Sequence, residues 1–146
     1  MEKMIIPIGC DHAAFEMKVA LIEWLEGLGY KLIDFGTNSA DSVDYPDFIH
    51  PVAKYIEENK ARLGIILCGS GNGAAMTANK HKSIRAALCW NIELAEMARL
   101  HNDANILSIP ARYISLETAK EIVKTYLNTD FEGGRHQRRL DKMIDF

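Results

Sequence analysis

The chain has 146 residues, close to the commonest size of one domain, so we expect a single domain over residues 1–146. Hydrophobic residues make up 48% and charged residues 25%, and the net charge of −3 disfavours nucleic acid or an anionic membrane as a partner. The three cysteines are odd in number and lack C-x-x-C spacing. Together with the lack of a signal-peptide pattern or an apolar membrane span, they predict a soluble protein of a reducing cytoplasm.

Short β-like apolar runs alternate along the chain with segments of helical period, which indicates βαβ units around a parallel sheet. The predicted strands are residues 4–9, 30–35, 63–67, 84–88 and 105–109. The predicted helices are residues 14–28, 48–56, 74–80, 92–100 and 116–127, followed by a short basic amphipathic tail. The expected fold is therefore α/β, a single-domain three-layer α/β/α sandwich around a Rossmann-like five-stranded parallel sheet.

The segment from residue 65 to residue 73 is the most informative part of the chain. An apolar strand ends at Cys68 and is followed by Gly69-Ser70-Gly71-Asn72-Gly73, before a predicted helix. Glycines let the backbone approach a ligand closely, and the free N–H groups at a helix start favour negative charge. The segment predicts a cradle for an oxyanion or a phosphate with a possible base at its edge. The alternative is a buried structural cysteine before a tight turn.

Polar residues follow two of the predicted strands at their carboxyl ends, where ligands bind in open α/β sheets. Asp11 and His12 follow the first strand, and Cys68 follows the third. His101 instead precedes the fifth strand, so it should lie at the opposite edge of the sheet. Either the predicted boundaries are off, or a second subunit brings His101 to the site.

Several familiar motifs are missing from the sequence. The first turn, Gly9-Cys10-Asp11-His12-Ala13, lacks the G-x-G-x-x-G of dinucleotide folds, and no lysine completes a nucleotide P-loop. In residues 69–73 the serine is one place early for an esterase elbow. The five histidines have no ligand-like spacing, so we expect no metal site. Arg135 and Arg139 are spaced i, i+4, which suits a phosphate grip or a solvated basic tail.

Six blocks of sequence, in order, resemble the B-type ribose-5-phosphate isomerases and their relatives acting on galactose and allose 6-phosphates. They are G-C-D-H-A at 9–13, D-Y-P-D at 44–47, C-G-S-G-N-G at 68–73, A-N-K at 78–80, R-L-H-N-D-A-N at 99–105 and F-E-G-G-R-H-Q-R-R at 131–139. The blocks span nearly the whole chain. Some members carry a glutamate after G-S-G-N-G and no cysteine before it. Here that place is Ala74 and the cysteine is present, which favours Cys68 as the base.

The resemblance implies an aldose–ketose isomerase that works through an enediolate, without a metal or an organic cofactor. Cys68 matches the base that abstracts the proton beside the carbonyl. The Ser70 hydroxyl is placed to move a proton among the sugar oxygens. The backbone amides expected to stabilise the oxyanion are those of Gly69, Gly71, Asn72 and Gly73.

The resemblance also implies roles for residues outside this loop. His101 matches the group that opens the sugar ring, and Asp11 either holds a hydroxyl or assists the opening. The phosphate grip would consist of His12, Arg135 and Arg139, so that segment 131–146 completes the phosphate site. The further substrate contacts would be Tyr45, Asn102 and Arg112. Part of such a site crosses a dimer interface, which predicts a homodimer or a dimer of dimers.

Interconversion of ribose 5-phosphate and ribulose 5-phosphate, in the non-oxidative branch of the pentose phosphate pathway, is the function that the resemblance favours. A hexose 6-phosphate isomerase, for allose or galactose 6-phosphate, would use the same residues. A non-catalytic sugar-phosphate sensor would need the phosphate grip but no base. A redox role for Cys68 is disfavoured because no resolving cysteine is adjacent.

Overall fold

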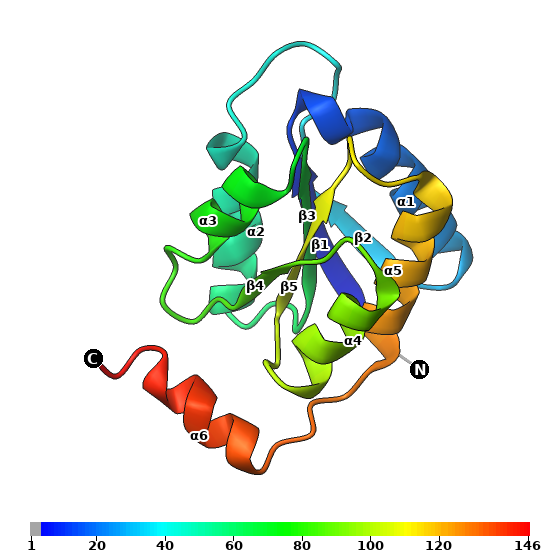
Figure 1. Cartoon of the computed structure of the whole chain (residues 1–146). Helices are drawn as coiled ribbons and strands as arrows, with labels where there is room; N and C mark the ends of the chain where they lie inside the picture. Colours follow the sequence, from blue (N-terminus) through cyan, green and yellow to red (C-terminus); the bar gives the residue numbers. More distant parts are fainter. Residues whose placement is uncertain (1–3) are drawn as a thin grey trace.

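The computed structural model describes residues 4–146. The first three residues of the predicted domain 1–146 lie outside the described residues. Five strands form one parallel sheet in the order β2-β1-β3-β5-β4 (Figure 1). The strands are β1 (Ile5–Cys10), β2 (Lys31–Asp34), β3 (Gly64–Cys68), β4 (Ala86–Leu88) and β5 (Ile106–Pro110). The helices are η1 (His12–Ala14), α1 (Phe15–Gly27), α2 (Pro46–Glu57), α3 (Asn72–Ala78), α4 (Ile92–Leu100), α5 (Leu116–Asn128) and α6 (Arg135–Lys142).

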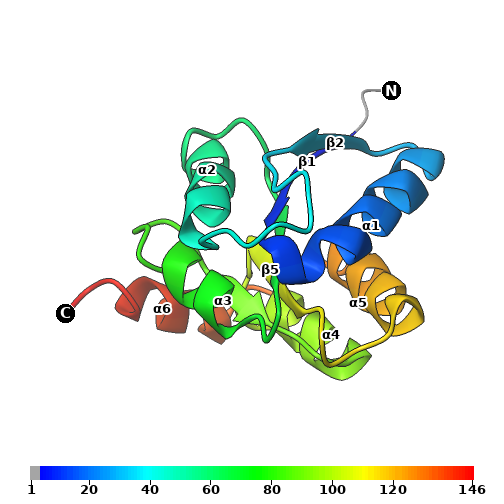
Figure 2. The same cartoon turned by 90° about the horizontal axis from the view of Figure 1, so that it is seen from above.

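Helices cover both faces of the sheet. Seen from above, α2 and α3 lie on one side of the strands and α1, α4 and α5 on the other (Figure 2). Each face has its own hydrophobic cluster, one of which includes Leu21 from α1 and Tyr126 from α5 and the other Ile49 from α2 and Ala74 from α3. Helix α6 lies beyond these layers, below the sheet in Figure 1.

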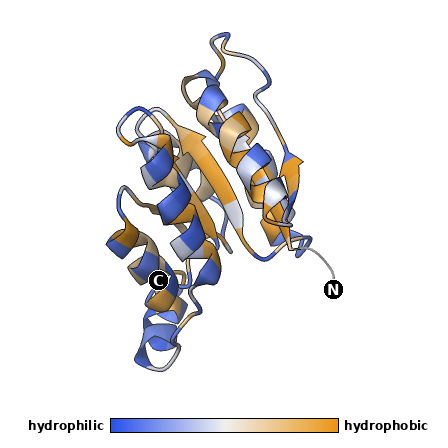
Figure 3. Ribbon diagram, turned by 90° about the vertical axis from the view of Figure 1, so that its right-hand side faces the viewer, coloured by the Kyte–Doolittle hydropathy of each residue, from blue (hydrophilic) through white to orange (hydrophobic). Residues whose placement is uncertain are grey.

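The central strands are hydrophobic along their length because they are covered on both faces. Every residue of β3 and β5 is buried, and Figure 3 shows apolar strands between helices that carry both hydrophilic and hydrophobic residues. The edge strand β2 has no fully buried residue. Burial is therefore greatest around β1, β3 and β5, and the rigid centre of the sheet carries the loops that follow β1 and β3.

The structure confirms the predicted fold class and the order of its elements. Most boundaries agree within one or two residues, and α4 (Ile92–Leu100) agrees at both ends. Helix α3 begins at Asn72, two residues before the predicted start, because Asn72 and Gly73 form its first turn and do not belong to the glycine-rich loop. The predicted basic tail is helical at Arg135–Lys142, and His136 and Leu140 are buried. Within residues 4–146, no helix is long and apolar enough to cross a membrane.

Candidate active site

The connections that follow the parallel strands β1 and β3 pass to opposite faces of the sheet. After β1 the chain passes to α1 on one face of the sheet, whereas after β3 it passes to α3 on the other face. The adjacent strands β1 and β3 are paired up to Cys10 and Leu67, so the loops after them diverge from neighbouring points. Such a switch point leaves a crevice at the carboxyl ends of the strands, where open α/β sheets bind ligands. Asp11 and His12 begin one loop, and Gly69 begins the other.

Cys68, the last residue of β3, is buried, with its sulfur turned toward the following loop. The backbone N–H of Gly71 donates a hydrogen bond to its Sγ over 3.1 Å. A backbone donor aimed at sulfur stabilises negative charge there. The thiol of Cys89 instead donates to the carbonyl of Ala87, which keeps its proton engaged.

The other two cysteines lie in surroundings that hold them in the thiol form. Burial raises the pKa of Cys10 to about 11, although the charge of Lys18 opposes this rise. Burial also raises the pKa of Cys89, to about 12. Among the three free cysteines, Cys68 is therefore the one whose sulfur accepts a backbone hydrogen bond from a glycine-rich loop.

Two contacts fix the turn at Gly71. Its φ of +77° favours glycine, and a side chain there would approach a Leu88 methyl carbon to 2.5 Å. The buried hydroxyl of Ser108 donates to the Gly71 carbonyl over 2.7 Å. Sequence reasoning missed Ser108, although one polar residue inside the apolar strand Ile106–Pro110 is the signal that could have found it. Together the contacts hold the Gly71 amide toward Cys68.

The amides of the loop are not equally free. The Asn72 N–H donates to the Ser70 hydroxyl oxygen over 3.2 Å, which leaves the hydroxyl proton free to be donated. The Gly71 N–H is already bonded to Cys68. The N–H groups of Ser70 and Gly73 have no hydrogen-bond acceptor in the described part of the chain. An incoming oxyanion would thus find Gly73, at the start of α3, as a free donor.

Two side chains from other elements lie directly over the glycines. The Tyr45 ring, at the start of α2, lies so close to Gly73 that an added Cβ would be 2.5 Å from its Cζ. The Arg112 side chain lies 3.3 Å from the equivalent position on Gly69, and its backbone N–H donates to the Gly69 carbonyl. A side chain at Gly73 would therefore displace the Tyr45 ring, and one at Gly69 would crowd Arg112, and both neighbours were predicted to bind substrate.

Asp11 and His12 lie in the loop after β1, at the same carboxyl edge of the sheet as Cys68. The buried carboxylate of Asp11 accepts from the Ala13 N–H over 3.1 Å, which caps η1. The Val43 N–H donates to Nδ1 of His12 over 3.1 Å. Because Nδ1 accepts, the neutral His12 ring carries its proton on Nε2, which can donate to an anionic group. Asp11 thus offers a hydrogen-bond acceptor to a ligand, and His12 offers a hydrogen-bond donor.

The remaining predicted residues lie at the other end of the sheet. His101 caps the carboxyl end of α4, and Asn102 follows it toward the start of β5. Arg135 and Arg139 lie on α6, below the sheet in Figure 1, and are exposed. One chain therefore brings Cys68, Asp11, His12, Tyr45 and Arg112 together. It does not bring His101, Asn102 or the two tail arginines to them.

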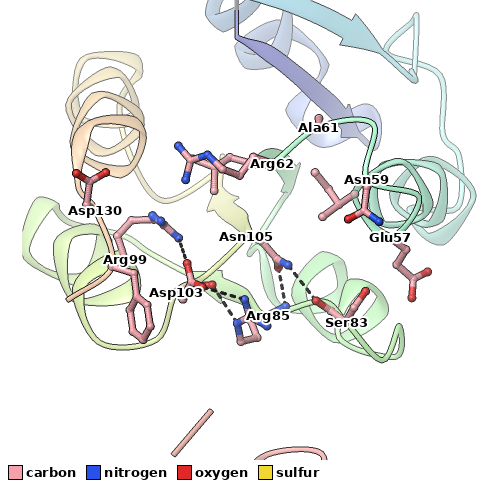
Figure 4. Close-up of a pocket in the computed structure, with 13 residues that line it drawn as sticks. Glu57, Asn59, Ala61, Arg62, Ser83, Arg85, Arg99, Asp103, Asn105 and Asp130 are labelled. Carbon is pink, nitrogen blue, oxygen red and sulfur yellow. Dashed lines mark hydrogen bonds and ion pairs between the residues drawn. The ribbon is translucent and has the colours of Figure 1, made fainter. Parts of the chain in front are cut away.

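An ion-pair network shapes the loop that carries His101 and Asn102. Asp103, at φ +43°, accepts from Arg99 over 2.8 Å and from Arg85 over 3.3 Å. Asn105 accepts from the Arg85 backbone N–H and donates to the Ser83 carbonyl. Figure 4 shows these groups meeting in one cavity. Arg99, Asp103 and Asn105, which lie close to His101 in the sequence, thus have structural roles.

That cavity, of about 630 Å³, is at the opposite edge of the sheet from Cys68. Its lining includes Leu63, Arg85 and Asn105, each of which directly precedes a strand. Size alone would make it the first candidate for a ligand site. Two of its three arginines, Arg85 and Arg99, are, however, already paired with Asp103, which leaves only Arg62 for an anion. The chemistry favours the crevice beside Cys68.

One further cluster of polar side chains has no counterpart among the sequence predictions. His101, Glu132 and His136 come together at the junction of α4 and α6, and the two imidazole rings stack with centroids 4.2 Å apart. The Glu132 N–H donates to the Leu100 carbonyl, which holds the segment before α6 against the end of α4. Sequence spacing could not indicate this cluster, since 31 residues separate Glu132 from His101.

The parallel α/β sheet, with a thiol and a glycine-rich helix start at its switch point, defines the class of open α/β proteins that bind small anionic ligands at the carboxyl ends of their strands. The sequence narrows this class. The pattern of the Ribose/Galactose Isomerase family matches residues 6–143. The chain belongs to that family.

Individual relatives agree along almost their full length. The ribose-5-phosphate isomerase B of Escherichia coli is 40% identical over 136 residues, 93% of this chain and 91% of that protein. A ribose 5-phosphate isomerase from Thermotoga maritima is 47% identical, with a TM-score of 0.97 over 99% of this chain and 100% of that one. The Mycoplasma genitalium ribose-5-phosphate isomerase B, solved with bound ribulose-5-phosphate, is 39% identical with a TM-score of 0.94, covering 99% and 97% of the two chains.

Proposed function

We propose that this protein is an isomerase that interconverts ribose 5-phosphate and ribulose 5-phosphate through an enediolate. The observation that carries the proposal is the hydrogen bond from the Gly71 amide to the Cys68 sulfur at the switch point of the sheet. A donor at this sulfur stabilises the thiolate that a base requires, and unlike Cys10, which also accepts a backbone bond, Cys68 directly precedes the glycine-rich start of a helix. Membership of the Ribose/Galactose Isomerase family and the relative with bound ribulose-5-phosphate support the same substrate.

In the proposed reaction the Cys68 thiolate takes the proton from C2 of the open-chain aldose. The electrons of that C–H bond form the C1=C2 double bond, and negative charge moves to O1. The free N–H of Gly73 stabilises this charge, since α3 begins there. The Ser70 hydroxyl passes the O2 proton to O1. The Cys68 thiol then returns its proton to C1, and the ketose forms with Cys68 restored as thiolate.

The other groups of the crevice would hold the substrate. Nε2–H of His12 and the exposed guanidinium of Arg112 suit the phosphate or the sugar oxygens. The Tyr45 hydroxyl lies beside Gly73 and would bond a sugar hydroxyl. The Asp11 carboxylate already accepts one N–H, and its remaining acceptor capacity would hold a second hydroxyl.

A second copy of the chain would supply the rest of the site. His101 and the tail arginines Arg135 and Arg139 cannot reach Cys68 within one chain, because they lie at opposite ends of the sheet. In a homodimer with its two sheets oppositely directed, each crevice would receive His101 as the ring-opening acid and the partner's segment 131–146 as part of the phosphate grip.

An exposed apolar surface supports a dimer with this arrangement. Met76 on α3, Trp90 after β4 and Ile92 at the start of α4 have exposed fractions of 65%, 55% and 40%. Trp90 and Ile92 follow the carboxyl end of the edge strand β4, and Met76 lies on α3, which contacts β4. Exposed large apolar side chains around an edge strand suit an interaction surface. The three free thiols further favour a reducing compartment such as the cytoplasm.

The activity is tested by incubating the chelator-treated protein with ribose 5-phosphate and, separately, with allose and galactose 6-phosphates. We expect the pentose to be converted fastest and, in D₂O, its ketose product to carry solvent deuterium at C1, the carbon to which the Cys68 thiol returns a proton. Faster conversion of a hexose would keep the mechanism and change the substrate. Binding without turnover of any of the three would contradict an isomerase and favour a sugar-phosphate sensor.

A further inference from the structure

We propose that His101, Glu132 and His136 form a binding site for one divalent transition-metal ion of the Zn²⁺ type, and that its occupation inhibits the enzyme. The metal-binding part rests on the geometry of these three residues alone. The inhibition rests on the function proposed above, because it requires that His101 opens the sugar ring.

The three side chains offer a metal-like donor set. One ligand atom from each lies within 4.8 Å of the other two, and the His101 Nε2 is 3.9 Å from a Glu132 carboxylate oxygen. Two imidazoles and one carboxylate are a set that holds Zn²⁺ with an open fourth position. The ligands come from the end of α4, from the segment before α6 and from α6 itself, so one ion would join three parts of the chain.

His136 provides a second, independent observation. It is 5% exposed, and its Nε2 is buried without a hydrogen-bond partner in the described part of the chain. A buried polar nitrogen without a partner is costly, so its presence calls for an explanation. Burial lowers the pKa of His136, and nearby positive charge on His101 and Arg135 acts in the same direction. The ring is thus held neutral, which is the form that binds metals.

The cluster can close on an ion with small movements. Zn²⁺ bonds of about 2.0–2.1 Å place neighbouring ligand atoms roughly 3.3 Å apart. The side chains of His101 and Glu132 are 39% and 52% exposed, so they are free to rotate toward the fixed ring of His136. The stacked rings are inclined by 14°, and His101 must tilt away from the stack to aim its nitrogen at the same ion.

Charge limits the affinity of the site. Arg135 and Arg139 lie on the same helix as His136 and repel a cation, while Glu132 attracts it. We therefore expect reversible binding that a strong chelator removes. A bound ion would occupy the His101 nitrogen that the proposed ring opening needs.

Binding is tested on the full-length, tag-free protein by titration with Co²⁺, which reports its ligands by visible absorption. We expect one ion per chain and no near-ultraviolet thiolate band. Glu132→Gln and His136→Asn should each weaken Co²⁺ binding by on the order of tenfold or more. Each removes a direct ligand, and loss of a group that merely supports a ligand already has an effect of that size. Since His136 is buried, its variant is used only if its thermal unfolding is cooperative, whereas Glu132→Gln changes an exposed side chain.

The chain offers a matched control in its other histidine pair. His50 Nδ1 and His81 Nε2 are 2.7 Å apart, and His81 is bonded to Glu57 over 2.7 Å, so these nitrogens already bond one another or a carboxylate. His50→Asn should leave Co²⁺ binding unchanged. Loss of binding in His50→Asn, a thiolate band from cysteine, or unchanged binding in Glu132→Gln would each overturn the proposed site.

Inhibition is measured separately with Zn²⁺ and the substrate that the enzyme converts. We expect wild-type turnover to fall with added Zn²⁺ and to recover with EDTA, whereas Glu132→Gln, compared with its own metal-free rate, loses at least tenfold in sensitivity to Zn²⁺. Co²⁺ binding without Zn²⁺ inhibition would overturn the inhibitory role and leave the metal site. A protein that converts no sugar phosphate but binds Co²⁺ through these residues would contradict the proposed function alone.

Discussion

The backbone N–H of Gly71 points at the sulfur of Cys68 over 3.1 Å, and the Gly71 carbonyl on the other side of the turn is held by the Ser108 hydroxyl over 2.7 Å. One residue thus joins the proposed base to the centre of the sheet. A positive φ and the contact with Leu88 leave no room for a side chain at this place. The position of the thiol is set by backbone geometry, which gives Cys68 a fixed donor before any substrate arrives.

Replacing the proposed base tests its role directly. We expect Cys68→Ser to lower kcat about 10²- to 10⁴-fold, the range of a lost general base, while substrate binding measured by calorimetry changes little. Cys89→Ser is the matched control, because Cys89 belongs to the other hydrophobic cluster and its thiol donates to the Ala87 carbonyl. Normal turnover in a folded Cys68→Ser protein would remove Cys68 from the mechanism.

Mixing two inactive variants tests whether the site is shared between chains. Cys68→Ser and His101→Asn should each be nearly inactive as homodimers. After they are unfolded and refolded together, about a quarter of the wild-type activity should return, since half of the random dimers are heterodimers with one intact site each. Refolding each variant alone is the control. Absence of any recovery in mixtures shown to contain heterodimers would place both residues in the same chain's site.

Gly73→Ala tests the contact with Tyr45. The added Cβ would meet the Tyr45 ring at 2.5 Å, so we expect a loss of about 1–3 kcal/mol in unfolding free energy and weaker substrate binding. Tyr45→Ala in the same chain should restore much of the stability but not the binding. Gly27→Ala, with nothing within 4 Å, is the control and should be neutral or stabilising. Equal effects of the two glycine substitutions would show that the contact does not matter.

Asp103→Ala tests the network that holds the His101 loop. It leaves the buried guanidinium of Arg99 without its charged partner, so we expect destabilisation of about 3 kcal/mol in urea unfolding. Activity in the folded fraction should also fall, because His101 and Asn102 lose their fixed position. Asp130→Ala removes an exposed carboxylate from the rim of the same cavity and should stay within about 0.5 kcal/mol of the wild type. Similar losses for both would contradict the structural role of Asp103.

Alkaline pH should weaken the fold through two buried thiols. Burial raises the pKa of Cys10 to about 11 and the pKa of Cys89 to about 12, from the ordinary value of 9.0 for a cysteine thiol. Above pH 9 the unfolded chain loses these protons and the folded chain keeps them. The free energy of unfolding should therefore fall with rising pH between about 9 and 11, by on the order of 1.4 kcal/mol per pH unit for each thiol. In Cys89→Ala this slope should be about half as steep, and an unchanged slope would show that Cys89 does not ionise on unfolding.

The fold class, the order of the elements and the loop at residues 68–73 could be predicted from the sequence because they depend on local patterns. Apolar periodicity separates strands from helices, and glycines mark the turn before a helix. The same patterns place Asp11, His12 and Cys68 at the carboxyl ends of strands, since the direction of a parallel strand follows from the chain order.

Only the tertiary structure decided which distant side chains meet. The insertion of β5 between β3 and β4, the bond from Ser108 to Gly71, the pairing of Asp103 with Arg85 and the stack of His101 on His136 all join residues far apart in the chain. Local periodicity carries no information on such pairings, because they depend on how whole layers pack. The separation of His101 from Cys68 by the length of the sheet, in contrast, follows from the chain order, since His101 precedes a strand and Cys68 ends one, and it is the reason that the proposed site draws on two chains.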